Sequence, residues 1–164
     1  MKWLATILAS TALCWPVAMA HAEDTWKVRM DPLLALANFP NLEVDRAISP
    51  NLSVGAMIWH FDGDWYDSEQ MTSIGMRLDW FERGVFSSGW HTNLILKGDF
   101  VETQLERTRI KGTQTYQWSR NRFHINAGIG LQFLLGGFSD ADDDVYVYDS
   151  WVYPAWELSI GRSF

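Results

Sequence analysis

A serine hydrolase site is one chemistry that the sequence could support. Such a site needs a serine hydroxyl, a histidine that activates it and a carboxylate that orients the histidine. His60, Asp64 and Ser68 are close together in the sequence and carry these three groups. The other interpretation, an interfacial histidine followed by a solvated acidic loop, is the one we favour. We therefore predict no catalytic residue and no enzymatic activity.

Two further histidines each precede an asparagine. His91 is followed two positions later by Asn93, and His124 is followed at the same spacing by Asn126. An amide offers no hydroxyl nucleophile, so neither pair indicates a hydrolase. We interpret both histidines as hydrogen-bonded residues on an inward-facing surface.

The composition narrows the class of protein that must position these residues. The chain has 164 residues, a net charge of -7 and a single cysteine, Cys14, which excludes a disulfide framework. An acidic chain is a poor partner for nucleic acid. Aromatic residues make up 15% of the chain, yet beyond the N-terminus no apolar stretch approaches the roughly 20 residues of a membrane-spanning helix. The chain thus combines many aromatics with no helical membrane segment.

The N-terminus is typical of a secretory signal peptide. Lys2 provides a positive start, residues 3–17 are almost wholly apolar, and residues 18–22 contain small-x-small cleavage patterns. We predict that residues 1–22 are removed. Residues 23–164 are then expected to form one domain that folds outside the cytoplasm.

The rest of the chain alternates with a period of two, which is the period of a β-strand. In residues 123–136 the odd positions are apolar, and the even positions are mostly small or polar. Turn residues such as Pro50 and Gly84 separate the alternating runs. We predict eight antiparallel strands, at about residues 25–36, 40–48, 51–61, 71–82, 89–101, 108–119, 122–136 and 151–164.

One face of these strands carries charges of both signs. The positive and negative side chains nearly balance, as they must in a packed interior, because an unpaired buried charge is very costly. The same face is rich in Gly, Ser and Asn, which leave space for long side chains. We predict a charge network inside the lumen that consists of Lys27, Arg29, Asp31, Glu43, Asp45, Arg77, Asp79, Lys97, Asp99, Lys111 and Glu157.

The opposite face is aliphatic and has aromatic residues near the strand ends, a pattern typical of a wall in contact with lipid. A strand of about ten residues tilted near 45° spans roughly 23 Å, which is close to the apolar band of an outer membrane. Edge strands cannot stay open in hydrocarbon. We therefore predict an all-β fold, an eight-stranded antiparallel up-and-down transmembrane β-barrel. The predicted membrane-rim aromatics are Trp26, Trp80, Trp90, Trp118, Trp151 and Trp156.

The connections between the predicted strands fall on two sides of the membrane. Short or Gly- and Ser-rich turns are expected on the periplasmic side together with both termini, and longer loops are expected outside. The turns are at 49–51, 83–89 and 119–122, and the outer loops are at 62–70, 102–107 and 137–150.

The last outer loop is rich in aspartate. Asp140, Asp142, Asp143 and Asp144 could offer carboxylate oxygens to a hard cation, but the glycine and the terminal glutamate of an EF-hand are missing. We predict no metal site and interpret the segment as a solvated acidic loop. Loosely held divalent ions that bridge to lipopolysaccharide phosphates are the alternative.

Three stretches, at residues 41–55, 116–118 and 123–130, look like strands of a known class of protein. They resemble small, largely uncharacterised outer-membrane barrels, which are similar to the membrane domains of OmpA and OmpX. The C-terminus, with Leu158, Ile160 and a final Phe164, is similar to the barrel-assembly signal of Gram-negative bacteria. The resemblance implies a location in the cell outer membrane and recognition of Phe164 by the barrel-assembly machinery.

These patterns together predict an outer-membrane protein with a structural or surface-interaction role, whose lumen is plugged by ion pairs. The expected partners are outer-membrane lipids and lipopolysaccharide, and we expect a monomer with no cofactor and no nucleic acid. Three alternatives stay open at this point. They are an enzyme that modifies lipid A or phospholipid on the same scaffold, a narrow porin, and a soluble barrel that binds a small ligand.

Overall fold

The structure of the chain is a computed structural model. The predicted signal peptide, most of the loops predicted at 62–70 and 137–150, and with them Asp64 and Ser68, lie outside the residues that it describes. It describes residues 25–37, 39–61, 70–101, 103–135 and 151–164.

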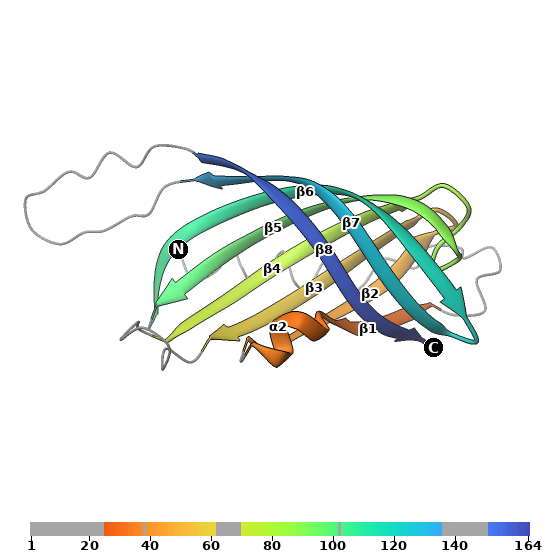
Figure 1. Ribbon diagram of the computed structural model, residues 1–164, viewed down its shortest axis with the longest axis horizontal. Coiled ribbons are helices and arrows are strands. Elements are labelled where there is room, and N and C mark those ends of the chain that lie inside the picture. The colour runs from red at the N-terminus through yellow and green to blue at the C-terminus, as the bar shows by residue number, and fades with distance from the viewer. Residues whose placement is uncertain (1–24, 38, 62–69, 102, 136–150) are drawn as a thin grey trace, which may run out of the picture.

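Eight antiparallel strands form a closed barrel, in which each strand pairs with its neighbour in the sequence and the last strand returns to the first (Figure 1). This arrangement confirms the predicted all-β, up-and-down architecture. One short helix interrupts the succession of strands. The elements are β1 (Trp26–Met30), α2 (Pro32–Leu36), β2 (Asn41–Ser49), β3 (Leu52–Phe61), β4 (Met71–Phe81), β5 (Gly89–Val101), β6 (Gln104–Arg120), β7 (Phe123–Leu135) and β8 (Trp151–Ser163).

The two ends of the barrel are built differently. We call one end the turn rim, because the connections 50–51, 82–88 and 121–122 lie there together with the C-terminal residue. We call the opposite end, where β1, β3, β5 and β7 finish, the loop rim. The site described below lies between these two rims.

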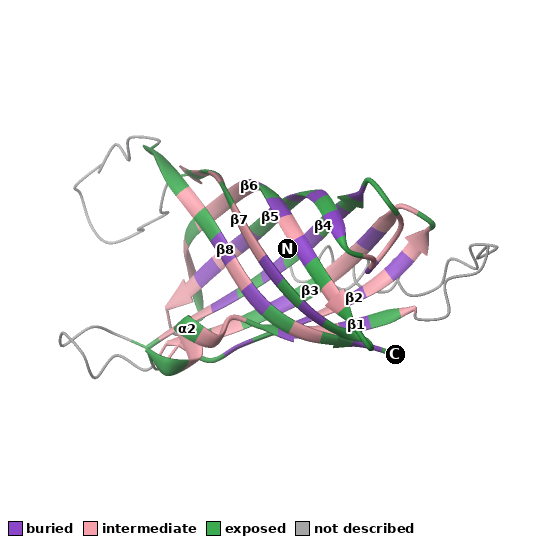
Figure 2. Ribbon diagram, turned by 45° about the vertical axis from the view of Figure 1, so that its right-hand side comes forward, coloured by how far each residue is buried: buried purple, intermediate pink, exposed green. Residues whose placement is uncertain are grey.

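Burial alternates along the strands, and Figure 2 shows it as bands of contrasting colour. In β4, residues 73, 75, 77, 79 and 81 are buried, whereas the residues between them are exposed. Most buried side chains are polar or charged, and most exposed large ones are apolar. This distribution is the reverse of a water-soluble protein, in which apolar residues fill the interior.

The first strand is shorter than predicted. The sequence predicts a strand over 25–36, but β1 ends at Met30 and α2 follows it. The Asp31 side chain accepts hydrogen bonds from the backbone N–H groups of Leu33 and Leu34, at 2.9 and 3.1 Å. An N-cap aspartate followed by a proline at the first helical position favours a helix start. The prediction that the first strand continues to residue 36 was therefore wrong.

The sixth strand is longer than predicted. β6 begins four residues earlier than expected, at Gln104. Its added residues pair with the end of β5, after a register shift between Asp99 and Phe100. A shift of this kind inserts an extra residue and increases the local twist. The predicted loop 102–107 therefore shrinks to the two residues between Val101 and Gln104.

The connection between β4 and β5 closes the turn rim. Phe86 in this connection is 5% exposed and packs with Phe81 and Ala47 in an apolar cluster inside the barrel. The two phenylalanine rings meet edge to face, with 6.0 Å between their centroids. The backbone of Phe86 has a φ of 62°, and the Ser119 hydroxyl donates a hydrogen bond of 2.9 Å to its carbonyl oxygen. We refer to Ala47, Phe81 and Phe86 as the aromatic plug.

Gly130 lies where β7 comes very close to β6. A Cβ atom at this position would overlap the backbone of Gly112 and Thr113. Because backbone cannot swing aside as a side chain can, we predict that Gly130→Ala lowers the free energy of unfolding by about 1–3 kcal/mol. Urea titration of the barrel refolded in detergent micelles, followed by tryptophan fluorescence, would measure this loss.

Gly112 provides a matched control for that substitution. It lies on the neighbouring strand, and a Cβ atom there would meet the carbonyl oxygen of Asn93 at an ordinary 3.9 Å. We expect Gly112→Ala to change the free energy of unfolding by no more than about 0.5 kcal/mol. Equal effects of the two alanine substitutions would show that the close approach at Gly130 has been misplaced.

Candidate functional site

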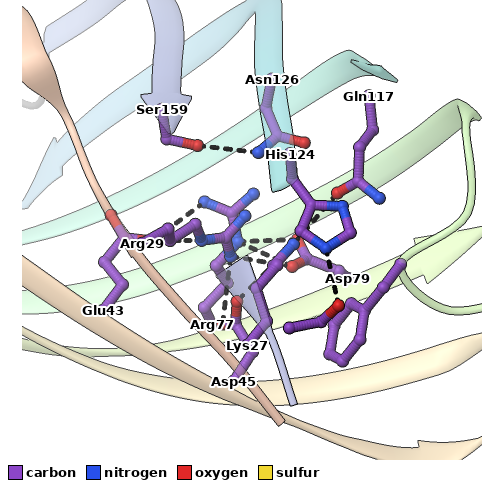
Figure 3. Close-up of polar contacts among 12 residues, drawn as sticks. Lys27, Arg29, Glu43, Asp45, Arg77, Asp79, Gln117, His124, Asn126 and Ser159 are labelled. Atoms are coloured by element: carbon purple, nitrogen blue, oxygen red, sulfur yellow. Dashed lines mark hydrogen bonds and ion pairs between the residues drawn. The ribbon is translucent and has the colours of Figure 1, made fainter. Parts of the chain in front are cut away.

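The candidate site is the interior of the barrel, where Arg29 is surrounded by acidic side chains (Figure 3). Arg29 is 1% exposed, and its guanidinium lies within ion-pair distance of carboxylates from β2, β4 and β8. The N···O distances are 2.9 Å to Glu43, 3.1 Å to Asp45, 2.9 Å to Asp79 and 3.7 Å to Glu157.

Arg77 shares three of these carboxylates with Arg29. Its Nε lies 2.7 Å from Asp79 and its Nη2 lies 2.6 Å from Glu157, while Nη1 is 3.5 Å from Glu43. Guanidinium groups offer five N–H donors in a fixed plane, so two of them can hold several carboxylates at once. We refer to Arg29, Arg77 and their four carboxylates as the ion cluster.

Strand register and a glycine make room for the ion cluster. Arg29 is the direct partner of Glu43 across the β1–β2 pair. Asp45 is the direct partner of Gly55 across the β2–β3 pair, and a Cβ atom at Gly55 would overlap the Asp45 carboxylate. Charged residues at every second position therefore point inward, and the small Gly55 on the neighbouring strand leaves space for one of them, Asp45.

Lys27 connects the ion cluster with the aromatic plug. Its Nζ lies 3.7 Å from an oxygen of Asp45 and donates a hydrogen bond of 3.1 Å to the side-chain oxygen of Gln117. The same Nζ lies 4.9 Å from the centre of the Phe86 ring, at cation–π distance. Lys27 therefore contacts both the ion cluster and the aromatic plug, in the half of the interior nearer the turn rim.

A second polar group lies nearer the loop rim. Asp99 forms an ion pair with Arg109 and accepts a hydrogen bond of 2.6 Å from the Ser73 hydroxyl. The predicted network contained Asp99 and omitted Arg109. The signal was present in the sequence, because Arg109 precedes Lys111 by two positions and therefore shares its face of the strand.

Three members of the predicted network have partners other than an ion. The Lys97 Nζ lies 3.4 Å from the centre of the Trp59 ring, and the Lys111 Nζ donates a hydrogen bond of 2.6 Å to the backbone carbonyl oxygen of Trp156. Asp31 caps α2 instead. Within the described part of the chain, neither lysine has a carboxylate at ion-pair distance. These three members of the predicted network therefore line the same interior cavity without forming a direct ion pair among the described residues.

A cavity of about 250 Å³ lies on the loop-rim side of the ion cluster. Arg77 and Glu157 line it from the cluster, and Lys97, Arg109 and Lys111 line it from β5 and β6. Among residues 25–37, 39–61, 70–101, 103–135 and 151–164, no group of three His, Cys, Asp or Glu residues is arranged to hold a metal ion. The polar lining of the cavity includes these lysine and arginine donors, the amides of Asn41 and Gln132, and the carboxylates of Asp31, Glu43 and Glu157.

The two interior histidines differ in their contacts. The ring nitrogens of His124 each lie 2.9 Å from a hydroxyl oxygen, one of Ser119 and the other of Ser163. His91 is fully buried and stacks on Phe81 with 4.7 Å between ring centroids, and neither of its ring nitrogens has a hydrogen-bond partner among the residues that the structure describes. The interpretation as a hydrogen-bonded interior residue thus holds for His124 and was wrong for His91.

His60 lies near the loop-rim end of β3, outside the cavity lining. Its Nδ1 is 3.2 Å from the hydroxyl oxygen of Thr72 on β4, and the ring is exposed. The other two candidate hydrolase residues, Asp64 and Ser68, lie outside the described residues. A role for His60 in a hydrolase site accordingly stays a sequence-based hypothesis.

The predicted rim tryptophans separate into three groups. Trp151 is exposed at the start of β8, on the loop rim. Trp156 pairs with Ile129, the central residue of β7, so the prediction that it marks a rim was wrong. The other four are exposed at the turn-rim ends of their strands, and they are Trp26, Trp80, Trp90 and Trp118.

The residues of the predicted assembly signal lie on the strand that closes the barrel. The backbone of Phe164 exchanges hydrogen bonds of 2.8 and 3.2 Å with Trp26 at the start of β1. The side chains of Phe164 and Ile160 are exposed, whereas Leu158 is half-buried beside the cavity. The last strand therefore presents a row of apolar side chains outward.

Comparison of the chain with protein-family models, with curated proteins and with solved structures gives no significant match. Within the ranges that the structure describes, no helix is long and apolar enough to cross a membrane. The functional assignment therefore rests on the geometry of the barrel, its ion cluster and its cavity.

Proposed function

We propose that this chain is an eight-stranded β-barrel of a bacterial outer membrane with a structural or surface-interaction role. The observation that carries the proposal is the outer surface, to which every strand contributes exposed apolar side chains. Ile129, Ile74 and Leu94 are 76%, 55% and 52% exposed. Soluble monomers rarely expose apolar surface on this scale, whereas contact with hydrocarbon favours it.

Two further features support a membrane location. Strands β2 to β7 are paired on both sides, and β1 closes the barrel against the end of β8, so most backbone groups of the wall have the partners that a segment immersed in hydrocarbon needs. The tryptophans of the turn rim form a belt at one end, and a Trp90–Tyr116–Trp118 ring cluster reinforces it with centroid distances of 5.2 and 4.7 Å. Aromatic belts of this kind are typical of the membrane–water interface.

We infer a plugged lumen and not a pore, because the ion cluster and the aromatic plug occupy the interior. We also infer a non-enzymatic role. His124 has both ring nitrogens engaged by serine hydroxyls near the turn rim, and His91 is stacked on Phe81. Neither histidine is poised to activate a nucleophile toward an outside substrate.

The proposed partners follow from the C-terminal strand, from the apolar outer surface and from the loop rim. The barrel-assembly machinery is expected to recognise the C-terminal strand with its final Phe164. Outer-membrane lipids and lipopolysaccharide are expected to contact the apolar belt and the loop rim.

The location can be tested directly. We expect the full chain, expressed in a Gram-negative host, to sediment with the outer membrane and to be released by detergent and not by high salt. An unheated sample should migrate faster than a boiled one on a denaturing gel, because a closed barrel resists unfolding by the gel detergent. A periplasmic marker protein serves as the control. Recovery of the folded chain in the soluble periplasmic fraction would contradict the proposal.

A further inference from the structure

The barrel is closed by a seam that is paired over only part of its length. β1 and β8 are in register over four residue pairs, from Lys27 with Ser163 to Met30 with Ile160. Beyond Met30 the chain turns into α2, which lies beside β8 (Figure 1). Within the described residues, 151–159 of β8 therefore have no partner strand on this side. An unpaired strand edge inside a hydrocarbon layer is costly.

The free edge of β8 is modified at two positions. The backbone of Phe164 forms hydrogen bonds with Trp26 of β1, whereas the backbone N–H of Ser163 donates to Arg122, on the side of β7. Because these directions alternate along a strand, the N–H and C=O groups of the even-numbered residues of β8 point to the free edge. One of these residues is Pro154, which has no N–H to leave unpaired. Another is Trp156, whose carbonyl oxygen accepts the hydrogen bond from Lys111. A lumen side chain thus reaches through the seam to the edge of the wall.

The cavity extends to this same edge. A cavity enclosed by an intact wall contacts every second residue of a strand, because the side chains alternate between the two faces. Here it is lined by all six consecutive residues from 154 to 159, and by Leu34 of α2. The cavity therefore reaches from the interior around the edge of β8 to the gap beside α2.

The polar groups around the cavity that lack partners are donors. Lys97 is 3% exposed and has the Trp59 ring as its partner, with no carboxylate at ion-pair distance in the described residues. Buried donors without a hydrogen-bond partner in the described structure are the Asn41 Nδ2, the Trp59 Nε1 and the Arg109 Nε. Buried polar groups normally find partners, so these donors are available to an acceptor that enters the cavity.

The acidic residues at the cavity are already engaged. Glu43 and Glu157 belong to the ion cluster, and Asp31 caps α2. Lys97, Lys111 and Arg109 face only Asp99 as an additional acid within the second polar group. The cavity lining thus carries four cationic side chains, Arg77, Lys97, Arg109 and Lys111, against the three carboxylates of Asp31, Glu43 and Glu157.

We propose that the cavity binds the oxyanion head group of a single-chain amphiphile, a phosphate or a carboxylate, and that the hydrocarbon chain leaves between α2 and β8. Lys97 and Lys111 bind the head group, and the Trp59 and Asn41 N–H groups donate to it. Leu34, Pro154 and Leu158 line the exit. A volume of about 250 Å³ is at the small end for ligand sites, which suits a head group and the first part of a chain.

The exit of the chain into a bilayer rests on the membrane location proposed above, whereas the donor-lined cavity does not. The test uses the full-length mature barrel, purified in dodecyl maltoside and shown to be folded by its heat-modifiable migration. Dodecyl phosphate is titrated into it by isothermal titration calorimetry, with protein-free micelles subtracted. We expect one saturable site per barrel. Inorganic phosphate is expected to bind more weakly by about tenfold or more, because it lacks the apolar chain.

Three variants identify the groups that bind. The double variant Lys97→Met and Lys111→Met is expected to raise the Kd for dodecyl phosphate by about tenfold or more, because two charge-assisted contacts are lost. Lys97→Arg keeps the positive charge and should largely retain binding. Arg120→Gln removes one positive charge from an exposed position at the turn-rim end of β6 that does not line the cavity, and it should leave the Kd unchanged.

Each outcome is decisive for a separate part of the proposal. Absence of saturable binding to folded barrel, or an unchanged Kd in the lysine double variant, overturns the site. Equal affinities for inorganic phosphate and dodecyl phosphate overturn the exit of the chain between α2 and β8. A chain that binds dodecyl phosphate but fractionates as a soluble protein would refute the proposed location and leave the site standing.

Discussion

Replacing Arg29 with methionine is expected to lower the free energy of unfolding of the barrel by about 3–5 kcal/mol. Methionine has a similar length but no charge, so Asp45 loses its guanidinium contact of 3.1 Å and Glu43 and Asp79 each lose one of 2.9 Å. Arg77 and Lys27 remain, but these two cations cannot balance four carboxylates. The loss is large because removing one partner leaves buried acids uncompensated.

Two controls separate this effect from a general loss of positive charge. Arg120→Gln removes a charge from an exposed position at the turn-rim end of β6 and should alter the free energy of unfolding by no more than about 0.5 kcal/mol. The double variant Arg29→Met and Asp79→Asn should be more stable than Arg29→Met alone, because one uncompensated carboxylate has been neutralised. Urea titrations of all variants in the same micelles give the comparison. If the loss of unfolding free energy in the double variant equals the sum of the losses in the two single variants, Arg29 and Asp79 are not coupled.

The fold was predictable because one physical constraint acts at every position of the wall. Inward residues such as Arg29 and Asp79 must find partners, outward residues such as Ile129 must not carry charge, and the two kinds alternate along each strand. This constraint predicts strands, their faces and a closed sheet, and the all-β barrel is confirmed. The constraint holds however far each strand is shifted along the barrel axis relative to its neighbours.

Features that depend on local competition or on register were missed. The Asp31–Pro32 helix start overrides an alternating pattern that continues to residue 36, because the cap satisfies backbone N–H groups at once. Trp156 was expected at a rim, but the length of β8 alone does not determine where along the barrel axis this residue lies. Its height follows from the pairing with Ile129, which the residue types leave open.

The cavity could not have been predicted from the chain for a similar reason. Its unpartnered donors come from β2, β3 and β6, which are far apart in the sequence, and the cavity reaches the gap beside α2 because β1 ends at Met30. The helix start at Asp31 is therefore connected with the proposed ligand site as well as with the fold. A first strand that continued to residue 36 would pair with β8 and close the route beside Leu34.

Substituting arginine for Ile129 is expected to lower the free energy of unfolding by about 2–4 kcal/mol in a bilayer. Ile129 is the central residue of β7, is 76% exposed and points away from the interior. At the midplane of a membrane the arginine side chain would place its charge in hydrocarbon, whereas on a protein surface in water the same change costs little. The substitution therefore distinguishes a membrane-facing wall from a solvated one.

The depth dependence of this cost gives the sharper test. Leu135 lies on the same face of the same strand, at its loop-rim end, and is 42% exposed. Leu135→Arg should cost about 0–1 kcal/mol, because an arginine near the interface reaches water and lipid head groups. Urea titrations of both variants refolded into phosphatidylcholine vesicles measure the difference. Small and equal costs at the two positions would mean that the apolar face of β7 does not lie in hydrocarbon, and the proposed location would fail with it.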